Sequence, residues 1–150
     1  MVELRRNRKS IRVETNKKEI KMKKLLIAGA LCFLVNIGIA QDLRKSGSTF
    51  GKIESNGDVR LNGSVKGKFE SNGDIRVDGS VKGKIESNGD IRKNGSVVGK
   101  VESNGDVRIN GSVVGKIESN GDVRKNGSVI GSASGVKKEQ AAVMFFFDFF

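Results

Sequence analysis

Small apolar side chains recur along residues 51–130 in a pattern that excludes a helix and predicts short strands. In the first copy of the pattern they fall at Ile53, Val59 and Val65, and the next copy begins with Phe69, so the steps are six, six and four. No helical face has this spacing, whereas Val and Ile between Asn-Gly pairs are typical of strands and tight turns. All three steps are even, and side chains alternate along a strand with period two. We therefore expect all of these residues to face one side of a sheet.

The first of two candidate turns in each copy is Asn56-Gly57. Asn and Gly tolerate the positive φ angles that turns require. A two-residue turn here would pair Ile53 with Arg60 and mix core with charge, so a three-residue loop is predicted instead. A loop over residues 56–58 would set Glu54 across from Arg60 as an opposite-charge pair.

The second candidate turn is Asn62-Gly63. A bulged three-residue loop over residues 61–63 would pair Val59 with Val65 and keep both on the apolar face. A third glycine, Gly67 in the first copy, falls in the middle of a strand, where it predicts a bend or a close approach of two backbones. The same glycine recurs at Gly83, Gly99, Gly115 and Gly131.

The pattern amounts to five 16-residue repeats, and this predicts an all-β fold. A unit this short cannot bury its own apolar side chains, so neighbouring hairpin-like units must share a core. A closed ring or flower and a short β-solenoid both satisfy this requirement. A parallel stack would place one Arg of every repeat in a ladder of like charges about 4.8 Å apart, which favours the ring.

One position that is expected to face outward changes from basic to apolar along the repeats. Lys66 and Lys82 follow the second turn valine in the first two copies, and Val98, Val114 and Ile130 follow it in the later ones. An apolar patch is predicted on that side, and it is a candidate interaction surface.

The C-terminal tail, residues 137–150, ends in a run of phenylalanines. It contains five of the seven phenylalanines that follow residue 40. The repeats supply only small and medium apolar side chains, and repeat arrays need capped ends. The Phe-rich tail is therefore predicted to plug a ring or to cap a stack, with membrane contact as the alternative.

Most of the basic charge lies before the repeats. Residues 1–40 carry 10 Lys and Arg against 3 Asp and Glu, which is +7 of the net +11. Met22-Lys-Lys, an apolar run over residues 25–39 and a small residue at Ala40 form the three parts of a secretory signal. The run is shorter than the ~20 residues that cross a bilayer, so no transmembrane span is expected in the mature chain.

These features predict four segments. Residues 1–21 are a basic extension, either disordered or wrongly assigned upstream of a true start at Met22, and residues 22–40 are a cleaved signal peptide. Residues 41–136 form the β-repeat domain, and residues 137–150 form the tail. The signal peptide predicts export to the periplasm, the cell surface or the medium.

The residue types after residue 40 exclude much chemistry. The chain has no His, and its one cysteine, Cys32, lies in the apolar run, where it is a small hydrophobe. Disulfides, thiolate or imidazole metal sites and His- or Cys-dependent catalysis are therefore excluded from the mature chain. Carboxylates such as Glu54 and Asp58 recur beside Arg or Lys, which favours surface ion pairs over Ca²⁺ binding or glycoside hydrolysis.

No catalytic, cofactor-binding or metal-ligating residue is predicted, and no cofactor. Five equal copies argue against a single asymmetric catalytic centre, so the chain is not expected to be an enzyme. The repeats lack aromatic residues interleaved with basic ones, so no nucleic-acid partner is expected. Four Asn-Gly-Ser triplets match the N-glycosylation pattern, but turn chemistry explains them and the signal peptide looks bacterial. They begin at Asn62, Asn94, Asn110 and Asn126.

The signal Met22-Lys-Lys-Leu-Leu, the repeated Gly-Lys-Ile-Glu-Ser-Asn-Gly-Asp-Val-Arg and the ending Ala141-Ala-Val143 with its Phe run resemble small exported bacterial proteins called fivefold β-flower proteins. The resemblance covers residues 22–150 and implies a ring-like arrangement of β units with no assigned activity. This chain has Asn-Gly-Asp where those proteins tend to have Asp-Gly-Thr.

Two functions remain open. The first is an exported structural or interaction module whose equivalent repeats bind a repetitive partner, such as a glycan or an envelope protein, by multivalency. The second is a self-assembling envelope β-solenoid, with the Phe-rich tail either blocking or mediating contact between copies. The oligomeric state, the ligand and the partner are not determined by the sequence.

Overall fold

The structure is a computed structural model that describes residues 41–150. The predicted extension, signal peptide and Cys32 lie outside the described residues. Within residues 41–150, twelve strands and one helix follow one another. They are β1 (Gln41–Lys45), β2 (Ser48–Ile53), β3 (Asp58–Leu61), β4 (Ser64–Phe69), β5 (Asp74–Val77), β6 (Ser80–Ile85), β7 (Asp90–Lys93), β8 (Ser96–Val101), β9 (Asp106–Ile109), β10 (Ser112–Ile117), β11 (Asp122–Lys125), β12 (Ser128–Ser132) and α2 (Lys138–Phe146).

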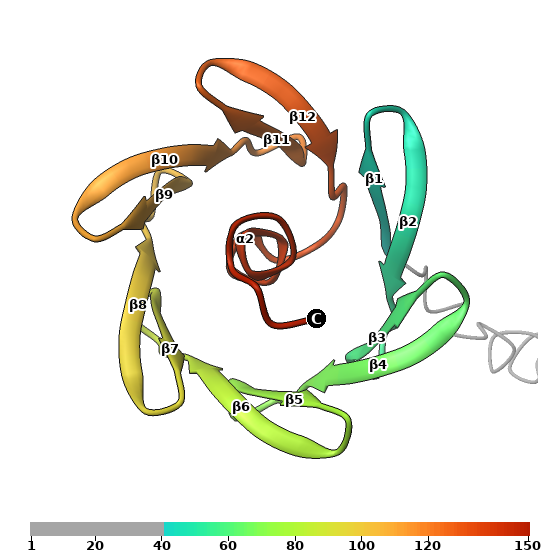
Figure 1. Cartoon of the computed structure of the whole chain (residues 1–150). Coiled ribbons are helices and arrows are strands. Elements are labelled where there is room, and N and C mark those ends of the chain that lie inside the picture. The colour runs from blue at the N-terminus through green and yellow to red at the C-terminus, as the bar shows by residue number, and fades with distance from the viewer. Residues whose placement is uncertain (1–40) are drawn as a thin grey trace, which may run out of the picture. The chain divides into compact units, whose positions relative to one another are not determined.

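The strands form a closed antiparallel ring in chain order, and β12 pairs with β1. Each pair joined by a tight turn, such as β3 and β4, projects outward and is called a petal here (Figure 1). The predicted ring is confirmed over the described residues, and the alternative of a stacked solenoid is wrong.

The ring has six petals, not the five repeats predicted. The sixth petal, formed by β1 and β2, precedes residue 51. Its residues Asp42-Leu43-Arg44 correspond to Asp58-Val59-Arg60 of the next petal. Leu43, which is fully buried, takes the place of the usual Val or Ile. Ser46 and Thr49 replace the turn Asn and the following Val, and these substitutions hide the copy from a search for exact repeats.

The turn at each petal tip has two residues, not three. Asn62 has φ 50° and Gly63 has φ 82°, the positive values that a two-residue I′ turn requires. Leu61 pairs with Ser64 across the turn, and the predicted pairing of Val59 with Val65 is wrong. The register then shifts between Val59 and Arg60, so the predicted bulge exists but lies beyond the turn.

This bulge reverses the predicted facing of two positions. Arg60 pairs with Val65 and Val59 pairs with Gly67, so Lys66 is the extra residue. Because one extra residue inverts the alternation, Val65 lies on the outside and is 48% exposed. The apolar residues at the bulge pack against the core instead, and they are Phe50, Val98, Val114 and Ile130. Lys66 and Lys82 at the same position are exposed. The predicted outward apolar patch of Val98, Val114 and Ile130 is therefore wrong.

The loop at the other end of each strand pair has three residues, as predicted, but begins one residue earlier. Gly57 N–H donates to the Glu54 carbonyl (2.8 Å), and Glu54 N–H donates to the Asp58 carbonyl (2.8 Å), so the loop is residues 55–57. Ile53 consequently pairs with Val59, and both are buried.

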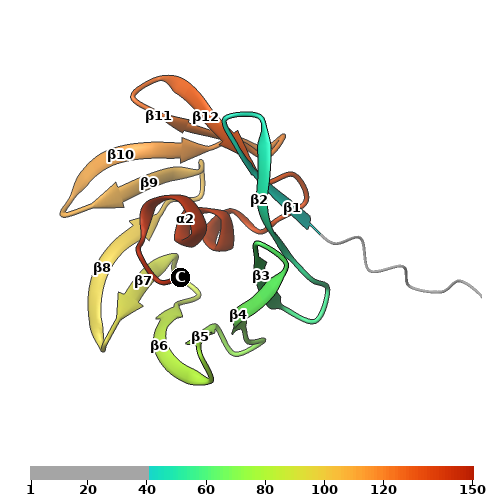
Figure 2. The same ribbon diagram turned by 45° about the vertical axis from the view of Figure 1, so that its right-hand side comes forward.

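The tail fills the ring, as predicted. Helix α2 lies at the centre (Figure 1), and its residues Ala141, Ala142 and Val143 are fully buried. Figure 2 shows the C terminus toward the end of the ring where the petal turns lie, and we call this the petal end. The three-residue loops surround the start of α2 at the opposite end, called the loop end.

Candidate functional site

The most distinctive exposed feature is one valine near each of five petal tips, on the outer face. These side chains are 48–52% exposed, and they are the large hydrophobic side chains most exposed among the described residues. In the first petal the equivalent residue is Thr49. We call the set the valine rim: Val65, Val81, Val97, Val113 and Val129.

The valine rim was not predicted, because residues 61–63 were interpreted as a three-residue loop. Asn-Gly between strands is the strongest indication of a two-residue turn. A two-residue turn at Asn62-Gly63 sets Val65 opposite Arg60, so Val59 and Val65 cannot both face inward. That mismatch is the feature of the sequence from which the rim could have been found.

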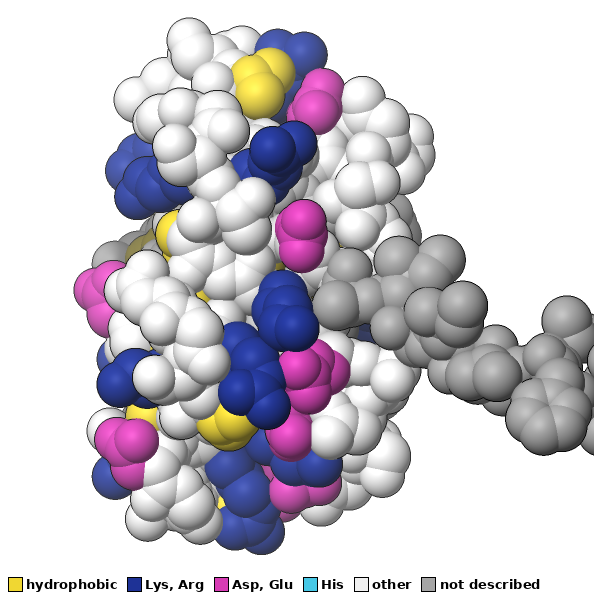
Figure 3. All heavy atoms as spheres, turned by 90° about the vertical axis from the view of Figure 1, so that its right-hand side faces the viewer, with side chains coloured by type: hydrophobic (Ala, Val, Ile, Leu, Met, Phe, Trp, Pro, Cys, Tyr) yellow, Lys and Arg dark blue, Asp and Glu magenta, His cyan; other side chains and the backbone are white. Residues whose placement is uncertain are grey.

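A charged belt runs around the strands beside the rim. Lys52 and Arg60 face each other across β2 and β3, a repulsive arrangement. Glu54 contacts both, at 3.3 Å from Lys52 Nζ and 2.7 Å from Arg60 Nε. The predicted pair of Glu54 with Arg60 is therefore confirmed, although it forms diagonally. Figure 3 shows basic and acidic side chains interspersed over one side of the ring.

The belt also perturbs two carboxyl groups. Hydrogen bonds from Arg60 and then Lys52 lower the pKa of Glu54 below its ordinary value. The pKa of Asp58 is lowered by a hydrogen bond from Asn56 Nδ2 (2.9 Å) and by another from Lys68 Nζ (3.2 Å). Each carboxylate has a basic partner, so these groups are poised as ion pairs and not as a general acid.

The basic and acidic side chains of the belt also balance where the ring closes. At the equivalent place between β12 and β1, Ser132 faces Arg44, and Ser134 replaces the glutamate. The lysine that would repel Arg44 and the glutamate that would compensate are thus absent together. The repeated belt positions hold as many basic as acidic side chains, so the excess of basic charge lies elsewhere. It includes five lysines on the petals: Lys45, Lys66, Lys82, Lys93 and Lys125.

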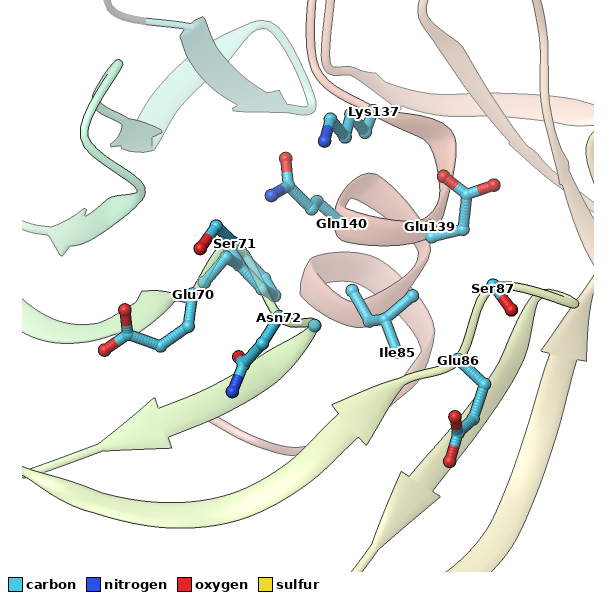
Figure 4. Close-up of a pocket in the computed structure, with 11 residues that line it drawn as sticks. Glu70, Ser71, Asn72, Ile85, Glu86, Ser87, Lys137, Glu139 and Gln140 are labelled. Carbon is cyan, nitrogen blue, oxygen red and sulfur yellow. The ribbon is translucent and has the colours of Figure 1, made fainter.

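Clefts at the loop end are polar and open. Two of them, about 380 and 390 Å³, lie between neighbouring loops and the first residues of α2. In Figure 4 the carboxylates of Glu70 and Glu86 point away from the helix, while Ser71 and Ser87 lie nearer to it. Within residues 41–150 no group of His, Cys, Asp and Glu is arranged to hold a metal ion. The cleft of about 380 Å³ is lined by hydroxyl and amide groups together with Lys137 and Glu139 at the start of α2.

A family model described as "Bactofilin: Polymer-forming cytoskeletal" matches residues 59–140, more than half of the chain. The chain belongs to the bactofilin family. Bactofilin membership corrects the resemblance to exported fivefold β-flower proteins. No curated protein and no solved structure matches the chain.

Membership of a cytoskeletal family also corrects the predicted localisation. A cytoskeleton lies inside the cell, so the family contradicts export to the periplasm, the cell surface or the medium. The segment that carried this prediction, residues 22–40, lies outside the described residues. In the part of the chain that the structure does describe, no helix is long and apolar enough to cross a membrane.

The family supports the second of the two functions considered above better than the first. A polymer-forming cytoskeletal bactofilin is a structural protein that self-assembles, which is consistent with the prediction that the chain is not an enzyme. Oligomerisation is therefore expected. The comparisons lend no support to a glycan or an envelope protein as partner.

Proposed function

We propose that this bactofilin is the subunit of a structural polymer in which closed rings contact one another through the valine rim. The observation that carries the proposal is a half-exposed valine at the same position of five petals. Exposed apolar surface is a candidate contact site, and here the same valine is offered at five places around one ring.

Ring closure supports contact through side chains. Strand addition at a sheet edge needs unpaired backbone groups, and a closed sheet has no edge. Each of the twelve described strands has a neighbour on both sides. A polymer built from this ring must therefore use surfaces of side chains.

Repetition of the rim valines increases the free energy of association between two rings. Burying the exposed half of one valine contributes roughly 1 kcal/mol, which is too little for a stable contact alone. Several rim valines engaged together contribute several times as much, and the second contact between two rings forms at high effective concentration.

The Phe-rich tail does not compete as a contact surface. Phe147 and Phe149 are 9% and 8% exposed, because they lie inside their own ring. A tail that fills its own core is not available to another copy. The tail therefore acts as an internal plug, and the petals are the surfaces open to a neighbour.

The experiment replaces all five rim valines with threonine in the full-length chain. Threonine has nearly the same shape, and Thr49 already occupies this position in the first petal. A matched control replaces five exposed loop serines with alanine: Ser55, Ser71, Ser87, Ser103 and Ser119. Sedimentation velocity and electron microscopy then compare the polymers.

We expect concentration-dependent polymers from the wild type and the serine control, and much shorter ones from the threonine variant at unchanged circular dichroism. A wild-type chain that stays monomeric at all concentrations would refute the proposed function. Polymers of unchanged length from the threonine variant would refute the valine rim as the contact.

A further inference from the structure

Nine Asn-Gly pairs lie in the described residues, and the structure divides them into two environments. Five lie in the three-residue loops, and four lie at petal tips. Asn-Gly is the dipeptide most prone to deamidation, because glycine leaves its own backbone nitrogen unhindered. The fold restrains that nitrogen and the asparagine side chain in one set and leaves them unrestrained in the other.

Loop asparagines are held by three hydrogen bonds. Asn56 Oδ1 accepts from Asp58 N–H (3.0 Å), and Asn56 Nδ2 donates to Asp58 Oδ2 (2.9 Å). The attacking nitrogen is held as well, because Gly57 N–H donates to the Glu54 carbonyl (2.8 Å). The same contacts recur in the other four loops, at Asn72, Asn88, Asn104 and Asn120.

Tip asparagines lack these restraints. Among the described residues, no hydrogen bond engages the side chain of Asn94 or the N–H of Gly95. Asn94 is exposed and has φ 50°, and Asn62, Asn110 and Asn126 have the same exposure and φ.

The charges around the two sets of asparagines also favour deamidation at the tips over the loops. At the tip, Arg92 Nη1 donates to the Gly95 carbonyl (3.1 Å), so a guanidinium lies on the same residue whose backbone nitrogen must lose a proton. Positive charge favours the amide anion and the oxyanion that follow. In the loop, Asn56 lies beside the carboxylate of Asp58, which disfavours negative charge there.

We propose that Asn62, Asn94, Asn110 and Asn126 are sites of spontaneous deamidation, while the five loop asparagines are protected. The nitrogen of the following glycine loses its proton and attacks Asn Cγ. A new N–C bond forms, the bond from Cγ to the side-chain nitrogen breaks, and ammonia leaves. Water then opens the resulting imide at either carbonyl and gives aspartate or isoaspartate. No oxidant, reductant or enzyme is required.

The third petal shows what one product looks like. Asp78 stands where the other repeats have the tip asparagine, and its φ of 48° matches theirs. Each conversion adds one negative charge to a petal. Conversion of all four tips removes the net +4 that Lys and Arg give to residues 41–150 over Asp and Glu. Deamidation thus changes the charge beside the valine rim as the protein ages.

The test follows the asparagines by mass spectrometry in the folded, full-length chain at neutral pH. Asn56 and Asn120 lie in tryptic peptides of identical sequence and are followed together. Trypsin cuts after Arg60, so Asn56 and Asn62 are found in different peptides, and the other repeats divide likewise after Arg92, Arg108 and Arg124. A parallel sample in urea gives the intrinsic rate of every site. In the folded chain the tip sites are expected to convert about tenfold or more faster than the loop sites, because freeing a held N–H adds to the barrier.

Two variants sharpen the test. Arg92→Gln removes the guanidinium from one tip and is expected to slow Asn94 alone, with the other three tips as internal references. Asn94→Gln is expected to abolish the mass increase in that peptide, because a six-membered imide forms far more slowly. Loop sites that convert as fast as tip sites in the folded chain would overturn the proposal. Tips that stay unmodified while the urea sample converts would overturn it too.

Discussion

Phe147 lies directly against Gly99, the glycine in the middle of β8. A Cβ at Gly99 would lie 2.6 Å from Cε1 and Cζ of the Phe147 ring and 2.4 Å from the Arg108 carbonyl oxygen. The other tail phenylalanines repeat this contact around the ring in reverse order of the chain. Phe145 lies on Gly131, Phe146 on Gly115, Phe149 on Gly83 and Phe150 on Gly67. One glycine in a petal thus makes room for one aromatic ring of the plug.

Gly99→Ala is expected to destabilise the protein by roughly 3 kcal/mol, because both the backbone and the ring would have to move. The matched control is Gly95→Ala at the petal tip, where nothing lies within 4 Å of the added carbon and only the φ of +84° opposes it. That strain costs about 1–2 kcal/mol. Urea unfolding of the two variants measures the difference, and equal losses would show that Gly99 is not a packing site.

Removal of one plug ring tests the same contact from the other side. Phe147→Ala is expected to cost about 3–5 kcal/mol, the usual range for a buried phenylalanine. Phe150 is only partly buried, so Phe150→Ala is expected to cost clearly less. Thermal or urea unfolding ranks the two variants. A Phe147→Ala variant as stable as Phe150→Ala would contradict the plug.

Much of the fold could be predicted because turn residues and apolar spacing are local features of the sequence. The positions of both Asn-Gly turns, the buried Ile53 and Val59 and the close approach at Gly67 all followed from them. The plug followed from composition, since five of the seven phenylalanines after residue 40 lie in the tail.

Two features could not be predicted from local sequence patterns. One is the strand register at the bulge, and the other is the first petal, whose sequence has diverged from the other copies. Lys66 at the bulge shifts the register by one, and this turns Val65 from the core to the surface. The first petal retains Asp42, Arg44 and Gly47 but has lost the Asn and the Val of the tip. The valine rim was therefore missed although the Asn-Gly turn that implies it is visible in the sequence. The correction of the predicted localisation came from the family and not from the fold.

The lowered pKa values of Glu54 and Asp58 give acid sensitivity with a defined sign. Both carboxyls bind protons less tightly in the folded chain than in the unfolded one, so the unfolded state takes up more protons as the pH falls. Their contribution is fully present above the ordinary values of 4.5 and 3.8 and is lost as the pH drops through the lowered ones. NMR titration of the two carboxyls should give midpoints below those values.

Glu54→Gln should reduce the loss of stability in acid, because it removes one of the two groups. At neutral pH the same variant leaves Lys52 opposite Arg60 without a compensating carboxylate, so it should be less stable than the wild type at low salt. The difference should become smaller at high salt, because salt screens the repulsion between the two basic side chains. Stability measured by urea unfolding against pH and salt checks both effects. A wild-type curve that stays flat to pH values well below 3.8 would contradict the assignment.

Simultaneous replacement of the four tip asparagines by aspartate should leave the fold intact. Asp78 already occupies the same turn at φ 48°, within 2° of the asparagines, so the backbone requirement is met. The tips are exposed, and surface changes of this kind alter stability by about 0.5 kcal/mol or less each. Circular dichroism and urea unfolding should therefore resemble the wild type. If rings associate through the valine rim, the added charges should also make association more sensitive to salt than in the wild type. A variant that unfolds would show that Asp78 is tolerated for a reason particular to its own petal.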